Sequence, residues 1–561
     1  MDYVLPAAAA LVAILLVPGW SFYFDVTPKV VVLLAAAAVA MIGLGFPRSK
    51  WMMRIVAFQA AAVILATLFS THRWVSVYGS TWRRSGLFAE LAILVFAIGA
   101  TQVRDLRGWL RITVLASIPI ALYAMLQYFG IDPILSARGY QFGEGKYMIV
   151  RPPATLGHAA YLATYLLYVI FAGAELARRE STGLWRAAAI TASALAFFAM
   201  ALSGTRAALV GFAAGALFVA LRDRVNRKAL YAGVAMLAAI AMFYVTPWGE
   251  RLRARVFWSS EDALGGARLM LWRDTLRMSA GRPVSGFGPE TFSMEFPRHQ
   301  SVELARAYPD FYHESAHNVF LDALVSKGLL GLLAMLAAAA FGIAIARGFL
   351  GAALVAMLVS QQFTAFTVPT ELYFFLTLGM LAADPKASMA AAFKPLRIGA
   401  AVLFAGFAVY LATGDVLLGS ARRAMDHGEI DRAATFVDRA RQWNASADFY
   451  FSRRFAALNG LRSWQYGFAA AARATETADD PQNAWINLAA FQAGTNDAHA
   501  VERSLRSDIE IAPNWFKPHW LLAQVLQQQG RLGEARAEAT LAADRDGAKH
   551  PEVAATLHHL R

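Results

Sequence analysis

Residues 313–346 read HESAHNVFLDALVSKGLLGLLAMLAAAAFGIAIA, a short polar segment that leads into a long apolar run. Three polar side chains interrupt the hydrocarbon between residues 319 and 346: Asp322, Ser326 and Lys327. An apolar run of this length can cross the roughly 30 Å hydrocarbon core of a bilayer as one helix. The pattern therefore predicts a membrane helix that begins where a polar loop with two histidines, His313 and His317, ends.

Comparable apolar runs recur along the chain from residue 4 to residue 414. The composition agrees with them, because 58% hydrophobic and 16% charged residues leave too few polar side chains to cover a soluble protein of 561 residues. We expect about thirteen membrane helices, at residues 4–18, 29–46, 53–70, 85–103, 109–129, 157–177, 185–203, 206–222, 229–247, 317–346, 349–366, 371–383 and 397–414. The predicted fold class is all-α: a polytopic membrane protein with about 12–13 transmembrane helices, followed by a soluble helical-repeat domain.

The positive charges predict how the chain crosses the membrane. The net charge is +13, and the basic residues cluster in every second connector: Arg48, Lys50 and Arg54; Arg104, Arg107 and Arg111; Arg178, Arg179 and Arg186; Arg222, Arg224, Arg227 and Lys228; Lys386, Lys394 and Arg397. By the positive-inside rule these connectors face the cytoplasm, whereas the intervening loops and the C-terminal domain lie on the outer side. The charge therefore indicates topology, and no nucleic-acid partner is expected.

The two ends of the chain differ in character. The start, Met1-Asp2-Tyr3-Val4, lacks the basic segment and cleavage site of a signal peptide, so we expect a retained first helix. After residue 420 the composition is that of a soluble domain, and units at Trp485 and Trp520, with a degenerate one at Gly428, match the spacing of tetratricopeptide-like (TPR-like) repeats. We predict a membrane domain over residues 1–415, with a long outer loop at about 248–316, and a TPR-like domain over 420–561. That domain either binds a partner or stabilises the membrane domain as a lid.

Several cations are expected at the outer ends of membrane helices. Arg206 follows the Ser203-Gly204-Thr205 turn, and Arg268 begins an amphipathic segment of the long outer loop. A guanidinium stays charged and binds two phosphate oxygens at once, although an arginine at this depth is also typical of an interface anchor. The same two interpretations apply to Arg83 and Arg84 in the second outer loop, which add positive potential for an anionic substrate.

Two other helix entries carry polar groups on the same side. Arg151 to His158, followed by Tyr161, opens one membrane helix, and its Pro and Gly residues are also typical of a rigid helix start. At the other entry, a neutral His317 can take a proton from an incoming hydroxyl. Alternatively, His317 or Asn318 caps the first amides of the helix.

The segment His313-Glu314-Ser315-Ala316-His317 also fits H-E-x-x-H, the pattern that on a helix holds zinc between two histidines with a general-base glutamate. Glu371 is the third ligand that we would test. The motif falls at a loop-to-helix junction rather than within a helix, so a membrane zinc protease is the less favoured alternative. A transporter is also disfavoured, since it predicts charged residues paired near the middle of the membrane helices, and most ionisable groups lie at helix ends.

The order of six short motifs resembles the O-antigen ligase and polymerase (Wzy-C-type) superfamily: Asp25-Val26-Thr27-Pro28-Lys29, Gly79 to Gly86, Ser203-Gly204-Thr205-Arg206, Gly286-Phe287-Gly288-Pro289, Ser315-Ala316-His317-Asn318 and Gly328-Leu329-Leu330-Gly331. The resemblance covers residues 1 to about 415. It implies a metal-independent, inverting glycosyltransferase of the GT-C kind in the bacterial inner membrane, without a cofactor. Such an enzyme takes a glycan from undecaprenyl diphosphate on the periplasmic side and passes it to an acceptor hydroxyl.

The resemblance also implies roles for individual residues. Arg206 and Arg268 would bind the diphosphate leaving group, and His317 would act as the general base or orient the acceptor. Further substrate-binding residues are expected in the outer loops: Arg83, Arg84, Arg151, His158, Tyr161, His313 and Asn318. Three acceptors stay open. Lipid A core, the first expectation, would make the protein an O-antigen ligase. A growing glycan chain would make it a polymerase, and a protein hydroxyl would make it an O-oligosaccharyltransferase.

Overall fold

The computed structural model describes residues 3–43, 49–136, 139–142, 148–181, 183–222, 227–254, 266–383, 394–457 and 464–560. Several predicted features fall outside the described residues: Arg48, Arg224, Lys386, the side chains of Arg227 and Lys228, and residues 255–265 of the predicted outer loop. The described chain is almost entirely helical, with one two-stranded pair, β1 (Gln141–Phe142) and β2 (Ile149–Val150). The predicted all-α class is confirmed.

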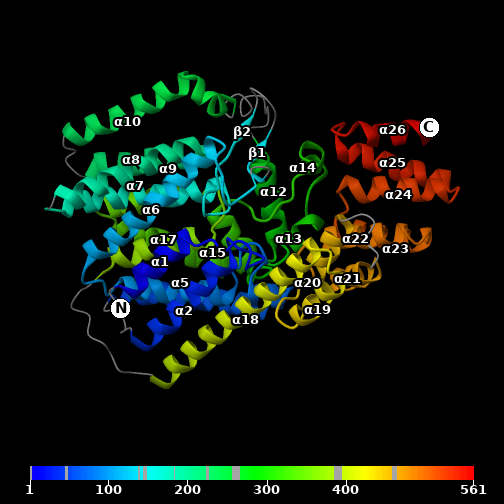
Figure 1. The fold of residues 1–561 in the computed structure, drawn as a ribbon, viewed down its shortest axis with the longest axis horizontal. Helices are drawn as coiled ribbons and strands as arrows, with labels where there is room; N and C mark the ends of the chain where they lie inside the picture. The colour runs from blue at the N-terminus through cyan, green and yellow to red at the C-terminus, as the bar shows by residue number, and fades with distance from the viewer. Residues whose placement is uncertain are drawn as a thin grey trace.

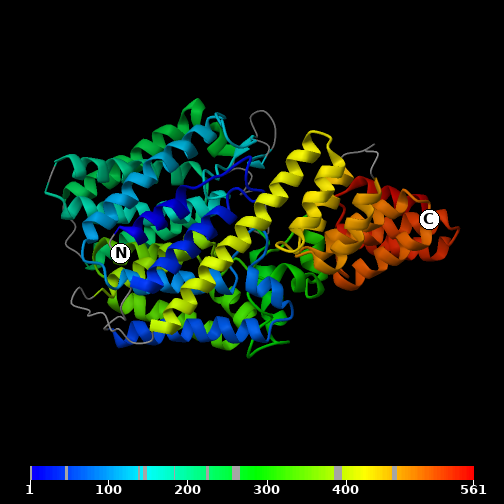
Figure 2. The ribbon, with the colours of Figure 1, turned by 60° about the horizontal axis from the view of Figure 1, so that its bottom comes forward.

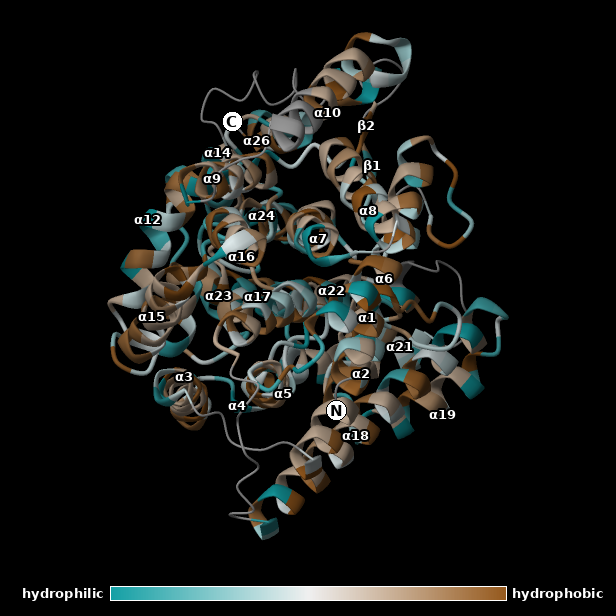
Figure 3. Cartoon of the chain, turned by 90° about the vertical axis from the view of Figure 1, so that its left-hand side faces the viewer, coloured by the Kyte–Doolittle hydropathy of each residue, from teal (hydrophilic) through white to brown (hydrophobic). Residues whose placement is uncertain are grey.

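A helix lies at each of the predicted membrane segments: α1 (Val4–Ile14), α2 (Thr27–Gly43), α3 (Lys50–Leu68), α5 (Leu87–Ala100), α6 (Leu106–Tyr128), α7 (Ala159–Arg179), α8 (Gly183–Leu202), α9 (Arg206–Arg222), α10 (Arg227–Val245), α15 (Val319–Ile345), α16 (Gly348–Ser360), α17 (Val368–Leu381) and α18 (Lys394–Asp426). Among the described residues, α3, α6, α7, α8, α15 and α18 are long and apolar enough to span a bilayer, and further apolar helices are shorter. Figure 3 shows these helices nearly end-on, with α10 at the edge of the group. The protein is a multi-pass membrane protein.

Some helices are shorter than their apolar runs. The run at residues 4–18 predicted a longer first helix, but α1 ends at Ile14 because Leu15 has an extended backbone. Similarly, α16 ends at Ser360, six residues before the predicted end of its run. Hydrophobicity marks where the chain is buried, whereas the helix ends where the backbone turns, and the turns here carry apolar side chains.

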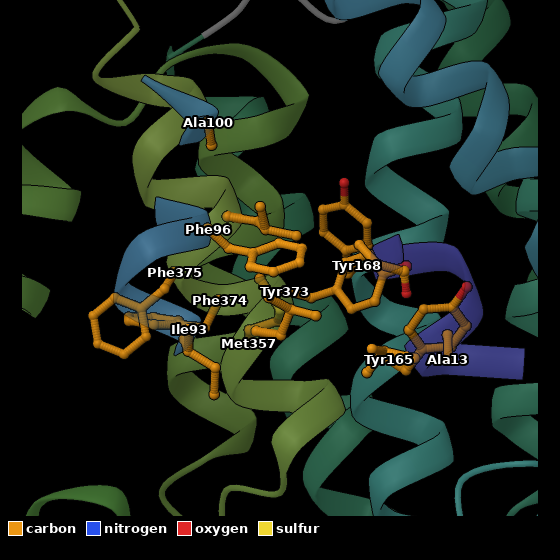
Figure 4. Packing of buried hydrophobic residues seen from close by; sticks show 14 of the residues in the cluster. Ala13, Ile93, Phe96, Ala100, Tyr165, Tyr168, Met357, Tyr373, Phe374 and Phe375 are labelled. Atoms are coloured by element: carbon orange, nitrogen blue, oxygen red, sulfur yellow. The ribbon is translucent and has the colours of Figure 1, made fainter. Parts of the chain in front are cut away.

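Aromatic side chains fill the centre of the membrane domain. Tyr165 and Tyr168 of α7 face Tyr373 of α17, with ring centroids 5.1 and 4.7 Å apart (Figure 4). The hydroxyl of Tyr373 donates to the carbonyl of Ala9 in α1 over 3.1 Å. The hydrogen bond satisfies a polar atom in hydrocarbon, where an unmade bond is costly. This packing holds the helices whose outer ends carry the loops described below.

The loop of residues 283–288 is fastened to a break in α15. At Gly328, φ is +63° and ψ is −161°, so the helix is interrupted inside its own length. Three backbone hydrogen bonds join the loop to the break: Phe287 N to Val325 O and Gly288 N to Ser326 O, both 2.9 Å, and Leu329 N to Pro283 O, 2.7 Å. Two of the sequence motifs, Gly286-Phe287-Gly288-Pro289 and Gly328-Leu329-Leu330-Gly331, are separate in the sequence but form one structural unit.

The outer loops contain short elements of their own: α4 (Arg73–Tyr78), η3 (Pro247–Gly249), α12 (Arg268–Ser279), α13 (Phe292–Glu295), η4 (Phe296–Arg298) and α14 (Val302–Ala307). In Figure 1 the labelled α12, α13 and α14 lie between the membrane helices and the C-terminal helices. The outer loop is thus a structured layer between the two parts of the protein.

The C-terminal part is a stack of helices: α19 (Ile430–Ala440), α20 (Ala447–Ala457), α21 (Trp464–Thr477), α22 (Pro481–Ala493), α23 (Ala498–Ile511), α24 (Phe516–Gln528), α25 (Leu532–Asp546) and α26 (Pro551–Leu560). It has apolar cores separate from that of the membrane domain. Helix α18 connects the two parts without a break, packing in the membrane core up to Leu411 and in the C-terminal core from Leu418 (Figure 2). The helical hairpins agree with a repeat architecture, and the TPR-like assignment stays a prediction.

We expect Gly328→Ala to destabilise the protein strongly. The backbone at residue 328 lies in a region that is essentially restricted to glycine, which costs about 1–3 kcal/mol for another residue. A Cβ at this position would also collide with the carbonyl oxygen of Val284. Thermal unfolding of the purified protein in detergent measures the effect. Gly399→Ala, in an open stretch of α18 with no neighbouring atom within 4 Å of the new Cβ, is the control, and an equal loss in both variants would contradict the prediction.

Candidate active site

The loops at one end of the membrane helices surround a cavity of about 1580 Å³. Its described lining comes from several stretches of the membrane domain, within residues 23–29, 82–83, 151–161, 204–210, 266–272, 303–317 and 363–369, and from residues 547 and 549 of the C-terminal domain. Most of the residues predicted to form a site line this cavity: Arg83, Arg151, His158, Tyr161, Arg206, Arg268, His313 and His317. Segments from along the whole membrane domain thus meet in one place.

Three arginines of the cavity lack an acidic partner. Within the described residues, Arg151, Arg206 and Arg268 make no ion pair, although their charges are close enough to act on one another. Arg206 is exposed at the start of α9, whereas the Nε of Arg151 is buried without a hydrogen-bond partner. Three cations without ion pairs in one cavity favour an anionic ligand, because like charges repel one another and a cleft lined by one sign of charge attracts the opposite charge.

Arg268 is held in position by the backbone. It begins α12, and its Nε and Nη2 donate to the carbonyl oxygen of Phe363, at 3.2 and 3.0 Å. Burial, together with the charge of Arg206, lowers the pKa of Arg268. The guanidinium keeps its other donors available, and its plane is fixed for a two-pronged contact with phosphate.

His317 lies beside these cations in a strained backbone conformation. Its φ of +52° is uncommon for a residue other than glycine, and the Ser315 hydroxyl accepts a hydrogen bond from its amide at 3.0 Å. Burial and the charges of Arg268 and Arg83 lower its pKa to about 3. The imidazole is therefore neutral near pH 7, with a nitrogen lone pair that can accept a proton or a hydrogen bond.

Asn318, rather than His317, caps α15. The Oδ1 of Asn318 accepts hydrogen bonds from the amides of Phe320 and Leu321 at 3.0 and 3.2 Å, while its Nδ2 donates to the backbone and side chain of Gln362. Asn318 is not among the residues that line the cavity. Because the cap is Asn318, the side chain of His317 is left free for another role.

At the other helix entry, His158 caps the helix and also lines the cavity. Its Nδ1 accepts the amide of Ala160 at 3.2 Å and so caps α7, while the ring is exposed in the cavity. Since Nδ1 is an acceptor, Nε2 carries the proton and is a donor. Although the ring is open to the cavity, the protein around it partly desolvates the imidazole, and this effect, with the charge of Arg151, lowers the pKa of His158 to about 3.

A hydrogen-bonded chain supports the wall next to His317. The Tyr161 hydroxyl donates to the carboxyl of Glu314 at 3.0 Å, and Arg83 donates to the backbone carbonyl of Glu314 at 3.2 Å. Arg83 also pairs with Glu290 at 3.0 Å, so its charge is balanced within the protein. Burial opposes the charge of Arg83, but Glu290 and Glu314 outweigh it and raise its pKa. Arg83 therefore braces this wall rather than adding a free positive charge.

Two of the predicted site residues have side chains that are buried in the protein instead of facing the cavity. Arg84 is buried, with its guanidinium 5.5 Å from the ring centre of Tyr23, and does not line the cavity. His313 reaches the cavity edge, but its ring is buried against Phe296, 5.5 Å away, and burial lowers its pKa to about 4. Packing thus accounts for the position of both side chains.

The zinc-protease pattern does not adopt the geometry that it needs. Residues 313–318 are not helical, and the positive φ of His317 prevents the two histidines from sharing one helix face. Glu371 lines a second, smaller cavity with Glu90 and Lys327 instead of the one with the histidines. No group of three potential metal ligands occurs in the part of the chain that the structure describes.

Comparison with known proteins agrees with this arrangement. Residues 191–336 match the O-antigen ligase (Wzy_C) family, a region that includes Arg206, Arg268 and His317. The predicted superfamily is confirmed. This chain carries an O-antigen ligase family domain. It is also 26% identical over 260 residues to the exopolysaccharide production protein ExoQ of Rhizobium meliloti (strain 1021), an alignment that covers 43% of this chain and 55% of ExoQ.

Strained backbone surrounds the cavity. Besides His317, positive φ angles occur at Ala154 in the cavity-lining 151–161 segment, and at Arg84 and Glu290 beside Arg83. Each such residue costs about 1–3 kcal/mol and persists only where the surroundings enforce it, commonly at functional sites. The clustering of strain around this cavity is independent support for a functional role.

Sequence patterns did not reveal several residues of the wall. Glu290, Glu314 as the partner of Tyr161, and the aromatic side chains of Trp82, Phe311 and Tyr312 were not singled out. A buried ion pair between Lys327 and Glu90, 2.8 Å apart, lies behind the site and was also missed. The partners of these residues come from distant segments of the chain, and no local pattern reveals such contacts. The only sequence signal for them was an isolated charge in a membrane helix.

We expect Glu314→Gln to change how stability depends on pH. Burial raises the pKa of Glu314 to about 7, so the folded protein favours the protonated carboxyl, and the carboxyl's contribution to stability is lost as pH rises from about 4.5 to about 7. Glutamine cannot ionise, but its oxygen still accepts from Tyr161. The melting temperature of the wild type relative to Glu314→Gln should therefore fall over this pH range and then level off.

The control for this measurement is Glu476→Gln, which changes an exposed carboxyl on α21. This variant should follow the wild type at every pH. If Glu314→Gln and Glu476→Gln both follow the wild type, the raised pKa of Glu314 is wrong.

Proposed function

We propose that the protein is a glycosyltransferase that moves a glycan from undecaprenyl diphosphate to an acceptor hydroxyl. The observation that carries this proposal is the set of three arginines, Arg151, Arg206 and Arg268, that make no ion pair within the described residues and share a cavity with a neutral His317. Two of these arginines and His317 lie in the region that matches the O-antigen ligase family. The arginines suit a diphosphate, which needs several fixed positive charges, and the histidine suits a hydroxyl that must lose a proton.

The proposed reaction is a single displacement. The acceptor oxygen attacks the anomeric carbon while its proton passes to the imidazole of His317, and the bond between that carbon and the diphosphate oxygen breaks. Undecaprenyl diphosphate leaves with the bonding electron pair, and Arg206 and Arg268 stabilise the charge that develops on it. The proton then leaves His317 for water or for the departing diphosphate. One displacement inverts the anomeric carbon, and the protein groups named here need no metal for their roles.

The same charges explain how a histidine with a low pKa can act as a base. Arg268 is one of the cations that lower the pKa of His317. A diphosphate bound by Arg206 and Arg268 brings negative charge that offsets them, so the pKa of the imidazole rises when the donor is bound. Proton transfer to His317 is therefore favoured only when the donor is in place.

We further propose that the cavity faces the periplasm and that the protein lies in the bacterial inner membrane. Support comes from the position of the basic connectors, which meet at the other end of the helices. There Arg111 pairs with Glu180 at 2.7 Å, Arg222 donates to the carbonyl of Ala346, and Arg397 to that of Met41. Positive connectors gathered at one end, with the cavity at the other, fit the positive-inside rule.

For the acceptor, the sequence-based expectation is lipid A core, as for an O-antigen ligase. The similarity to a protein of exopolysaccharide production favours a second candidate, a growing polysaccharide chain, as for a polymerase. Both acceptors present a sugar hydroxyl, and the displacement described above is the same for either.

We expect Arg206→Ala, Arg268→Ala and His317→Ala each to lower transfer by about 10²-fold or more, as is typical when a group that stabilises developing charge is removed. Arg206→Lys should also lose activity, because an ammonium does not reproduce the two-pronged contact. The measurement is release of undecaprenyl diphosphate from a lipid-linked oligosaccharide by purified protein in the presence of a chelator.

Arg277→Ala is the matched control, since Arg277 lies on α12 with Arg268 but is exposed and pairs with Asp274. It should retain full activity. Wild-type activity in Arg268→Ala or His317→Ala would remove that residue from the mechanism, and inhibition of the wild type by the chelator would contradict a metal-free reaction.

A further inference from the structure

The cavity extends well beyond the arginines. Its volume of about 1580 Å³ exceeds the roughly 300–1,000 Å³ of a pocket for one small ligand. The part away from Arg206 and Arg268 is lined by Trp82, Tyr308, Phe311 and Tyr312 from the outer loops, and by Lys549 of the C-terminal domain. We call the part lined by these residues the outer half of the cavity; the arginines that we propose to bind the diphosphate are not among them.

Aromatic rings face the open space in this outer half. Phe311 is 56% exposed and Tyr312 36% exposed, and Trp82 lies beside Tyr312 with ring centroids 6.2 Å apart. Large exposed aromatic side chains that gather in a hollow mark a binding surface. Flat rings in an aqueous pocket suit the apolar C–H faces of pyranose sugars, whose hydroxyl groups then point to polar neighbours.

The position of these rings argues against a simple membrane anchor. Tyr312 packs beside Trp82, and Thr81, the neighbour of Trp82, is hydrogen-bonded to Asp479 of the C-terminal domain. Tyr312 therefore lies against the C-terminal domain rather than among lipid head groups, and burial with the charges of Asp480 and Asp479 raises its pKa. Interface aromatics project into the bilayer surface, whereas this one lies between two parts of the protein.

The C-terminal domain builds the other side of this space. Buried Asp479 accepts hydrogen bonds from the amide and hydroxyl of Thr81, at 2.7 and 2.6 Å, and so fixes the loop that carries Trp82. Further along, Arg306 pairs with Asp544, close to Lys549. The exposed ammonium of Lys549, which makes no ion pair within the described residues, offers three donors to the cavity.

We infer that the outer half of the cavity is a saccharide-binding subsite for the acceptor, formed jointly by the outer loop and the C-terminal domain. The acceptor is a carbohydrate chain whose sugar rings stack on Phe311, Tyr312 and Trp82 and whose hydroxyl groups accept from Lys549. This inference rests on the proposed function for the direction of transfer, but the binding itself does not depend on catalysis.

The test separates binding from transfer. Oligosaccharide repeat units, released by mild acid from the lipid-linked pool of the cells that make the protein and therefore free of lipid diphosphate, are titrated onto the full-length protein in nanodiscs. We expect saturable binding that weakens at least fivefold in Phe311→Ala and in Lys549→Ala. Tyr466→Ala is the matched control, because Tyr466 is an exposed aromatic residue of α21 outside the cavity.

Kinetics with the same variants give a second result. The KM for the saccharide acceptor should rise at least fivefold, while the KM for the lipid-linked donor and the kcat at saturating acceptor stay unchanged. A variant that is merely misfolded would lose kcat and donor binding as well. Phe311→Tyr, which keeps a flat ring, should restore the acceptor KM.

The outcomes are distinct. Absence of saccharide binding with normal release of undecaprenyl diphosphate would overturn the subsite and leave the proposed function standing. Binding of a Ser/Thr-rich peptide that the saccharide cannot displace would overturn it in favour of a protein acceptor. Saccharide binding that depends on Phe311 and Lys549, without any donor cleavage by the wild type, would support the subsite and refute the proposed transfer.

Discussion

The backbone contact between the 283–288 loop and the break in α15 is the constraint on which the site depends. Gly286 and Gly328 let two main chains approach so closely that any side chain at either position would meet the other backbone. The contact fixes the outer loop to the helix that Asn318 caps, one residue after His317. The base that we propose at the start of this helix needs a loop that keeps the cations at a constant position, and this backbone contact holds the loop there.

The second constraint is electrostatic. Positive charges in a partly buried cavity destabilise one another and the folded state, and natural proteins normally pair them. Here Arg83 is paired with Glu290, whereas Arg151, Arg206 and Arg268 are not paired within the described residues. The contrast separates an arginine that is paired in the wall from arginines whose charge is available to the ligand that we propose, a distinction that the sequence alone does not reveal.

The fold class and several of the polar residues that line the cavity could be predicted from sequence because hydrophobic runs and motif order are local signals. The cap of α15 was predicted as one of two alternatives, and only geometry assigned it to Asn318 and freed His317. The pairing of Arg83, the inward position of Arg84 and the joining of the two glycine motifs depend on contacts between segments that are tens to hundreds of residues apart, which no local pattern encodes. Helix ends were imprecise because apolar turns and apolar helices have the same composition.

Helix α18 has a mechanical consequence. It is continuous over 33 residues from one end of the membrane domain into the C-terminal core, so the two parts are joined by a rod instead of a flexible linker. Each residue of an α-helix advances the chain by about 1.5 Å and turns it by about 100°. The length of α18 therefore sets the rotation of the C-terminal domain about the axis of this helix. Exposed side chains of α18 can change without moving the domain, whereas insertions and deletions within the helix would swing Lys549 and Asp479 away from the cavity.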